Sequence, residues 1–164
     1  MHGKQPGAGR PHMPGYGIPS DTDGLLPWSW AEDRLRDAHN YWIGTVGPDG
    51  RPHSMPVWGL WLDCEFWFST SGTSRKARNL TANGSCTVTT ERADEAVIVN
   101  GTAREESDVA RLEPFVEGYK KKYDWDMDPA SGGYFVVAPT VAFGFVEHAD
   151  QFAKTATRWR FDSR

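Results

Sequence analysis

Alternating apolar and polar positions dominate the middle of the chain. The segments YWIGTV (41–46), PHSMPVWGLWL (52–62) and EFWFSTS (65–71) are rich in β-branched and aromatic residues and are joined by short turns. The Asp-Gly pair at 49 and 50 is the strongest hairpin signal among these turns. We therefore predict an antiparallel meander over 41–71. Further strands are predicted in SCTVTTE (85–91), EAVIVNGTAREE (95–106), YFVVAPTVAFGFVEH (134–148) and TRWRF (157–161).

Helical spacing occurs in two segments before residue 84. Ser29 and Glu32 fit a capping box, and the apolar residues that follow predict a helix over roughly 30–40. The segment SRKARNLTAN (74–83) interrupts the strand pattern and predicts a second, short helix.

A third helix is predicted in SDVARLEPFVEGYKKKY (107–123). Ser107 and Asp108 are its candidate caps, and Pro114 predicts that it is kinked or divided. One stripe of this helix carries its apolar residues: Val109, Leu112, Phe115 or Val116, and Tyr119.

These elements define a mainly β fold of six or seven antiparallel strands with two or three helices and no repeated βαβ unit. Closing the sheet into a small barrel would remove its exposed edges. At 164 residues and 38% hydrophobic content, the chain supports one core, which we assign to a single domain over 28–164. Residues 1–27 are rich in Gly and Pro and are expected to form a flexible arm.

Composition excludes several classes of function. The net charge of -4 provides no general attraction for nucleic acid or an anionic membrane. No apolar run approaches the ~20 residues of a membrane span, and no signal-peptide core is present, so we expect a cytoplasmic protein. Cys64 and Cys86 lack metal-ligand spacing, and no metal site or Ser-His-Asp arrangement is predicted. Eight Trp and eight Phe are compatible with a dimer interface.

The strongest candidate for chemistry is FWFSTSGTSRKARNL (66–80), in which an aromatic strand runs into a basic helix start. Helix N-H groups, hydroxyls and flanking cations would together bind a phosphate. At ~100° per residue, Arg75, Lys76 and Asn79 fall in one sector and Ala77 and Leu80 in its neighbour. Pattern alone leaves two interpretations open: a phosphate site or a solvated basic helix start.

The segment PHSMPVWGLWLDCEFWFSTSGTSRKARNL (52–80) resembles the core of the pyridoxamine-phosphate-oxidase-like superfamily of flavin and deazaflavin oxidoreductases, and most of all its actinobacterial deazaflavin branch. The similarity runs in register from about 30 to 161. It implies an FMN-binding split β-barrel that forms a homodimer and completes each pocket with the second subunit. TRWRF contains no His, so the substrate motif of true pyridoxamine-phosphate oxidases is not matched and a vitamin B6 substrate is not expected.

The same resemblance implies a role for each residue of the pocket. Pro56, Val57 and Trp58 would line the tricyclic ring of the coenzyme. Ser69 and Thr70 would contact the linker or the phosphate. The phosphate would be held by Arg75, Lys76 and Asn79. The pattern of the 66–80 segment adds the hydroxyl of Ser74 to these phosphate contacts. From the second subunit, Arg158 and Trp159 would contribute a cation beside an aromatic ring, although Trp159 could equally face the core.

FMN and coenzyme F-420 both carry a tricyclic ring and a phosphate, so the 66–80 segment does not separate them. The family branch favours F-420, which transfers two electrons as a hydride. The implied function is an F-420-dependent oxidoreductase acting on a small electrophilic organic acceptor. Two alternatives remain: an FMN-binding oxidoreductase of the same fold, and a protein that binds a flavin, deazaflavin or haem without turnover.

Overall fold

A computed structural model describes residues 5–162 of the chain. Its helices are α1 (Trp28–Asp37), α2 (Arg75–Ala82), α3 (Val109–Tyr123), the 3-10 helix η1 (Pro129–Ser131) and α4 (Phe152–Thr155). Its strands are β1 (Gly7–Gly9), β2 (Tyr41–Val46), β3 (Pro52–Val57), β4 (Gly59–Leu62), β5 (Glu65–Ser69), β6 (Ser85–Thr90), β7 (Glu95–Glu105), β8 (Tyr134–Val146) and β9 (Thr157–Arg160).

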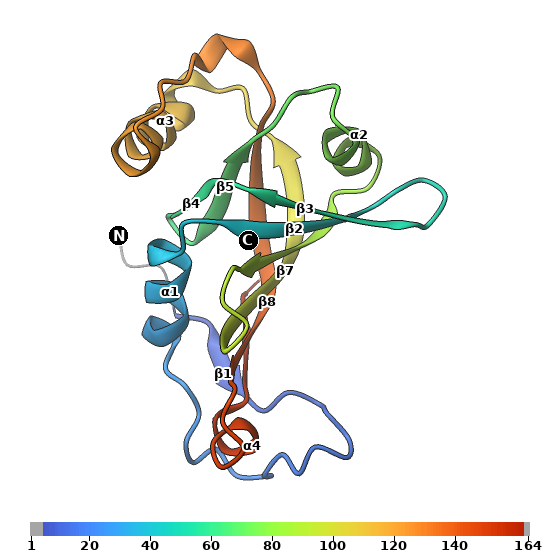
Figure 1. Cartoon of the computed structure of the whole chain (residues 1–164), viewed down its shortest axis with the longest axis vertical. Coiled ribbons are helices and arrows are strands. Elements are labelled where there is room, and N and C mark those ends of the chain that lie inside the picture. The colour runs from blue at the N-terminus through green and yellow to red at the C-terminus, as the bar shows by residue number, and fades with distance from the viewer. Residues whose placement is uncertain (1–4, 163–164) are drawn as a thin grey trace.

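All of these strands belong to one antiparallel sheet, ordered β1-β9-β8-β7-β6-β2-β3. The 13-residue strand β8 has β7 along one side. On its other side it pairs first with β5 and then with β9. Since β5 pairs in turn with β4, the sheet divides at β8 (Figure 1). The mainly β antiparallel class predicted from the alternation is confirmed, but the described residues form nine strands rather than six or seven. Strand β1 was not predicted, and the segment 52–62 is divided into β3 and β4.

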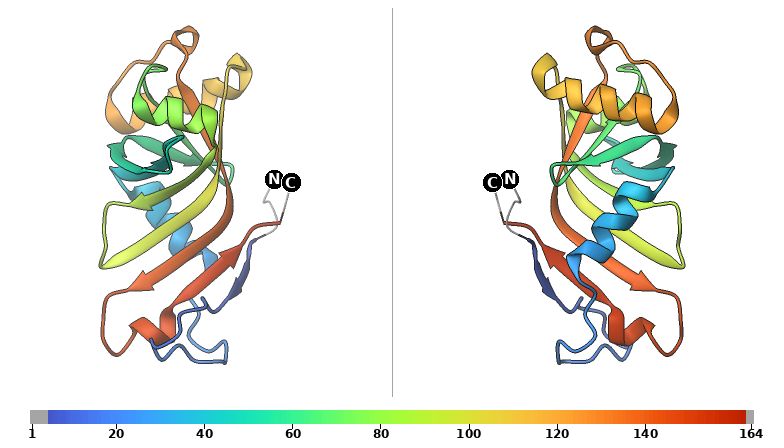
Figure 2. Two further views of the ribbon diagram at one scale, coloured as in Figure 1. Left: turned by 90° about the vertical axis from the view of Figure 1, so that its right-hand side faces the viewer. Right: turned by 90° about the vertical axis from the view of Figure 1, so that its left-hand side faces the viewer.

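Two apolar clusters fill the molecule. The larger joins α1 to the inner face of the sheet and contains Tyr41, Phe66, Phe68 and Trp159. The second lies between α3 and the β4–β5–β8 region and is built around Trp67 and Phe115. Helices α2 and α3 lie at one end of the sheet, and α4 lies with the N-terminal segment at the other (Figures 1 and 2).

The N-terminal segment makes contacts that its Gly- and Pro-rich composition did not indicate. Strand β1 pairs with β9, and the Arg10 side chain is only 10% exposed. Its guanidinium donates to the backbone carbonyls of Asp21, Asp23, Lys154 and Ala156. These bonds join the segment to the α4–β9 connection, while the flexibility expected for 1–27 stays a prediction.

Two helix expectations are corrected. Helix α1 begins two residues early, with Pro27 as N-cap and no side-chain cap, so Ser29 and Glu32 form no capping box. Glu32 instead accepts hydrogen bonds from Arg36 and from the Trp61 indole. Helix α3 is not divided at Pro114. Pro114 removes one hydrogen bond, to the carbonyl of Ala110, and both residues are exposed, so water can satisfy that carbonyl.

Replacing Arg10 with alanine should loosen the N-terminal segment. Loss of a charged donor to four carbonyls should cost about 1.5–3 kcal/mol, which lowers Tm by roughly 3–12 °C for a chain of this size. Chymotrypsin should cleave after the exposed Tyr16 faster than in wild type. Arg51→Ala, at a side chain 80% exposed, is the control and should leave Tm within about 2 °C of wild type. Equal Tm values and cleavage rates for the two variants would contradict the assignment.

Candidate functional site

A cavity of about 380 Å³ lies where β3, β5, α2 and α3 come together. Three of its lining residues, Pro56, Val57 and Trp58, were predicted to contact the ring of the coenzyme. Ser69 and Lys76 were predicted to contact its linker or phosphate, and Asn40 and Tyr119 were not predicted. Carbon-rich and aromatic surfaces therefore face the same space as a hydroxyl, an ammonium and an amide.

Trp58 is placed in the cavity wall by a break between β3 and β4. Its indole stacks on Tyr123 of α3, with ring centroids 4.7 Å apart and planes inclined by 4°. The hydroxyl of Tyr123 accepts from the Gly59 N-H (3.0 Å) and lies within hydrogen-bond distance of the carbonyls of His39 (2.8 Å) and Gly59 (2.9 Å), to one of which it donates. These contacts fix the break. Stacking occupies one face of the indole, yet Trp58 is still 38% exposed. The rest of the ring is accessible to a flat ligand.

The start of α2 forms the polar side of the cavity. Ser74 is the N-cap, and its Oγ accepts from the Ala77 N-H and from the Thr70 hydroxyl, both at 3.1 Å. Helix geometry leaves the N-H groups of Arg75 and Lys76 without an intrahelical acceptor. Within the part of the chain that the structure describes, Lys76 forms no ion pair, so its charge is available to an anion.

Thr70, Ser74 and Arg75 are close to this polar side without lining the cavity. Thr70 and Ser74 shape the strand-to-helix junction through their mutual hydrogen bond. Both contacts use Ser74 Oγ as an acceptor, so its own hydrogen can still be donated to an anion. Arg75 is exposed.

Asn79 corrects the expectation that its amide faces a ligand. The residue is 3% exposed, and its Nδ2 donates to Thr45 Oγ1 at 3.0 Å. It shares the buried side of α2 with Ala77 and Leu80. Asn79 therefore anchors the helix to β2, because a buried amide needs a partner and the strand beneath provides one.

A close backbone approach also shapes the junction. Gly133, with φ of 76°, accepts a hydrogen bond from Thr70 N at 2.9 Å through its carbonyl. A Cβ at this position would lie 2.0 Å from the Thr70 carbonyl oxygen. Only glycine permits this approach, which holds the end of β5 in position.

Arg158 and Trp159 lie on opposite faces of β9, far from this cavity. Trp159 is fully buried and packs edge-on against Trp28 at 5.4 Å, so its side chain belongs to the core, the second of the two orientations expected for it. Arg158 lies on the outer face. One cross-strand row, which we call the outer row, runs from the cavity to it through Pro56, Trp42, Thr89, Ile98, Phe143 and Arg158. Five strand-to-strand steps span roughly 24 Å along the sheet.

Asn40 and Tyr119 are the lining residues that sequence reasoning missed. Asn40 donates its Nδ2 to Glu91 at 2.9 Å, which orients its amide. Tyr119 was expected only on the apolar stripe of α3, and it serves both the second apolar cluster and the cavity. The stripe was therefore a signal for Tyr119, whereas nothing in the sequence marked Asn40.

A half-buried lysine lies behind the Trp58–Tyr123 stack. Lys122 Nζ donates to Tyr41 Oη (2.9 Å) and to the carbonyls of Arg36 and Gly59 (both 3.3 Å). Burial lowers the pKa of Lys122 to about 8, although Asp37 and Glu91 act in the opposite direction. Burial also raises the pKa of Tyr123 to about 12, and it raises the pKa of Tyr41 as well.

Comparison with known proteins identifies the family of this chain. Residues 31–143 match the family described as Pyridoxamine 5'-phosphate oxidase, and the chain belongs to that family. Its fold is accordingly the split barrel of pyridoxamine-phosphate-oxidase-like proteins. No curated protein matches the chain.

Solved structures similar to this chain have low sequence identity. An F-420 reductase shares 23% identity at a TM-score of 0.54, covering 68% of this chain and 94% of that one. A FAD-binding protein from Mesorhizobium loti shares 16% at 0.60, covering 83% and 96%. General Stress Protein 26 from Bacillus anthracis shares 20% at 0.58, covering 71% and 91%. The likeness to these three establishes the fold.

Two further observations concern the described residues alone. No helix among residues 5–162 is long and apolar enough to cross a membrane. In the same range, His, Cys, Asp and Glu side chains form no group of three or more that could hold a metal ion.

The buried Lys122 should give stability a distinct pH dependence. The ammonium is disfavoured in the folded state, so between about pH 8 and the unfolded pKa of about 10.4 the unfolded chain binds more protons and stability rises with pH. Lys122→Met removes this contribution while Tyr41, Tyr123, Asp37 and Glu91 remain. Urea unfolding at pH 7.5, 9 and 10 measures the free energy of unfolding of both proteins. As the pH rises, this free energy should increase more for wild type than for Lys122→Met. A difference between the two proteins that is constant over this range would refute the assignment.

Proposed function

We propose that this chain is an oxidoreductase that binds coenzyme F-420 in the cavity, with the ring against Trp58 and the phosphate at the start of α2. The observation that carries the proposal is the division of the cavity into two sides. Pro56, Val57 and Trp58 contribute apolar and aromatic lining, and Ser69 and Lys76 contribute groups that can bind an anion. A coenzyme with a tricyclic ring and a phosphate requires both surfaces.

The residues present fit such a group. An anion at the start of α2 would meet the ammonium of Lys76, the hydroxyl hydrogen of Ser74 and the N-H groups that the helix leaves unpaired. A ring against Trp58 would replace water on the exposed part of the indole. Arg75 and Arg78 are exposed on the same helix and suit the longer acidic tail of F-420.

The coenzyme would supply hydride transfer to a small electrophilic acceptor with an activated C=C, C=N or quinone-like group. The residues of the chain would bind and orient the ring and leave one face of it open. FMN is the alternative coenzyme, because the cavity offers the same two surfaces to it. A protein that binds a flavin, deazaflavin or haem without turnover is the alternative function.

A second copy of this chain is proposed to complete the site. Trp42, 48% exposed, pairs in register with Pro56 of the cavity wall, and Ile98 and Phe143 continue the outer row as partly exposed apolar residues. Burying such a surface against its copy would be favourable. Arg158 is too far from the cavity of its own protomer, so only a partner's Arg158 could approach it.

Lys76→Ala should weaken coenzyme binding by about 1.5–3 kcal/mol, the range for a hydrogen bond to a charged group. Tryptophan fluorescence during titration with coenzyme F-420 and with FMN measures the affinities. Lys121→Ala is the control, because it removes the same charge from an exposed site of α3 that does not line the cavity. Unchanged affinity in Lys76→Ala would remove the phosphate assignment, and preference for FMN would favour the alternative coenzyme. Tight binding without turnover of reduced F-420 over a broad acceptor panel would favour the binding-protein alternative.

The proposed dimer should depend on the outer row. Ile98→Lys places a charge in its centre, which should convert a dimeric wild type to a monomer in light scattering coupled to gel filtration. Val109→Lys adds the same charge at a 55% exposed site on α3 and should leave the dimer intact. A monomeric wild type, or a dimeric Ile98→Lys variant, would rule out this interface.

A further inference from the structure

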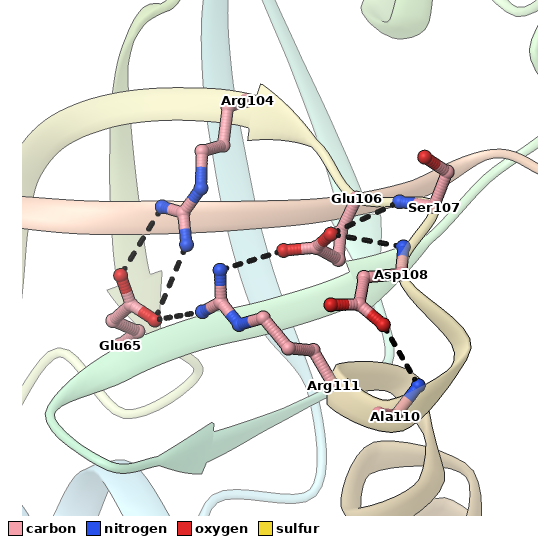
Figure 3. Close-up of polar contacts among 7 residues, drawn as sticks. All are labelled: Glu65, Arg104, Glu106, Ser107, Asp108, Ala110 and Arg111. Atoms are coloured by element: carbon pink, nitrogen blue, oxygen red, sulfur yellow. Dashed lines mark hydrogen bonds and ion pairs between the residues drawn. The ribbon is translucent and has the colours of Figure 1, made fainter.

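A carboxylate is buried at the start of β5, the end of that strand remote from the cavity. Glu65 is 6% exposed, and both of its oxygens are bound by arginines (Figure 3). Arg104 of β7 approaches Oε1 at 3.1 Å, and Arg111 of α3 approaches Oε2 at 3.1 Å. A carboxylate buried at this depth is stable only when cations and hydrogen bonds compensate it.

Arg111 also reaches a second carboxylate. Its Nη1 lies 2.7 Å from Glu106 Oε2, and Glu106 Oε1 accepts from the N-H groups of Ser107 and Asp108. Asp108 in turn caps α3 by accepting from the Ala110 N-H at 3.0 Å. We call Glu65, Arg104, Glu106 and Arg111 the Glu65 cluster. It fixes the first turn of α3 to β5.

Residues of β5 and α3 are matched at regular spacing from this cluster to the cavity. Three pairs of positions follow one another: Glu65 with Arg111, Trp67 with Phe115, whose rings stack at 5.9 Å, and Ser69 with Tyr119, which share the cavity. Two residues of a strand advance about 6.6 Å, and four residues of a helix advance about 6 Å. Because the two steps nearly match, the position of the first pair determines that of the third.

We propose that Glu65 and Arg111 are positioning residues for the cavity, whose ion pair sets the position of α3 along β5 and so places Tyr119 opposite Ser69. The ligand named in the test rests on the proposed function. The apolar contacts of Phe115 resist separation of α3 from the sheet, but they are non-directional and resist sliding weakly. The charge-assisted bonds of Arg111 have a fixed geometry and oppose sliding at the first turn of α3, as the hydrogen bonds of Lys122 and Tyr123 do at its last turn.

Arg104 provides a matched control. It binds the same carboxylate as Arg111 but belongs to β7, so it does not connect α3 to β5. The side chains of Arg104 and Arg111 are 41% and 43% exposed, which makes the two truncations comparable in burial. Arg104→Met and Arg111→Met each remove one cation from Glu65, and only Arg111→Met removes the ion pair that joins α3 to β5.

The test compares these variants by titration with coenzyme F-420 and FMN and by near-ultraviolet circular dichroism without ligand. The Trp58–Tyr123 stack contributes to the circular dichroism spectrum of the ligand-free protein. For wild type and each variant, this contribution, which we call the Trp58 signal, is obtained by subtracting the spectrum of the same protein that also carries Trp58→Phe. Arg111→Met should weaken binding roughly three- to thirtyfold and reduce the Trp58 signal. Arg104→Met should change binding by less than about twofold and keep the signal, and Arg111→Lys should recover much of both.

Equal effects of the two methionine variants, or an Arg111→Met variant with wild-type binding and signal, would overturn the proposal. If Arg111→Met does not fold, Arg111→Gln and Arg104→Gln are compared by the same criteria. If wild type binds neither coenzyme, the proposed function fails on its own. The Trp58 signal of the ligand-free protein then still decides whether Arg111 positions α3.

Discussion

Burial of β5 on both faces is the constraint on which the rest of the structure depends. Phe66 and Phe68 enter the larger apolar cluster, and Trp67, between them, enters the second. The strand is also paired on both edges, with β4 and β8. Side chains of period two therefore connect two cores through one strand. An element held from all sides gives a functional site rigid support.

The polar side of the cavity is built from backbone constraints more than from ion pairs. The Ser74 cap begins α2, Gly133 allows the close approach that holds Thr70, and Asn79 ties the helix to Thr45. Each contact uses a short side chain or none, so little side-chain entropy is lost in fixing the junction. Lys76 is thereby held at the cavity while its charge stays uncompensated by the described residues.

The outer row gives the opposite face of the sheet a separate role. Its members alternate with the core residues of the same strands, so a face bearing Trp42, Ile98 and Phe143 is a direct consequence of burying Tyr41, Val97 and Ala142. The row begins at Pro56 of the cavity and ends at Arg158. A partner placed on it would therefore lie beside the site.

The sequence by itself determined most of the strands and the basic start of α2, because period-two alternation and helical spacing are local properties. The resemblance to a family indicated most of the cavity lining, whereas neither β1 nor the break between β3 and β4 was indicated. Helical spacing separated Ala77 and Leu80 from Asn79 on α2, whereas the structure buries all three. The sequence did not separate Arg158 on the surface from Trp159 in the core. Only the tertiary structure decided the orientations of Asn79, Arg158 and Trp159. It also decided the buried pairing of Glu65 with Arg111, which are 46 residues apart. Such contacts depend on how the sheet divides at β8, and long-range pairing leaves no periodic trace in the chain.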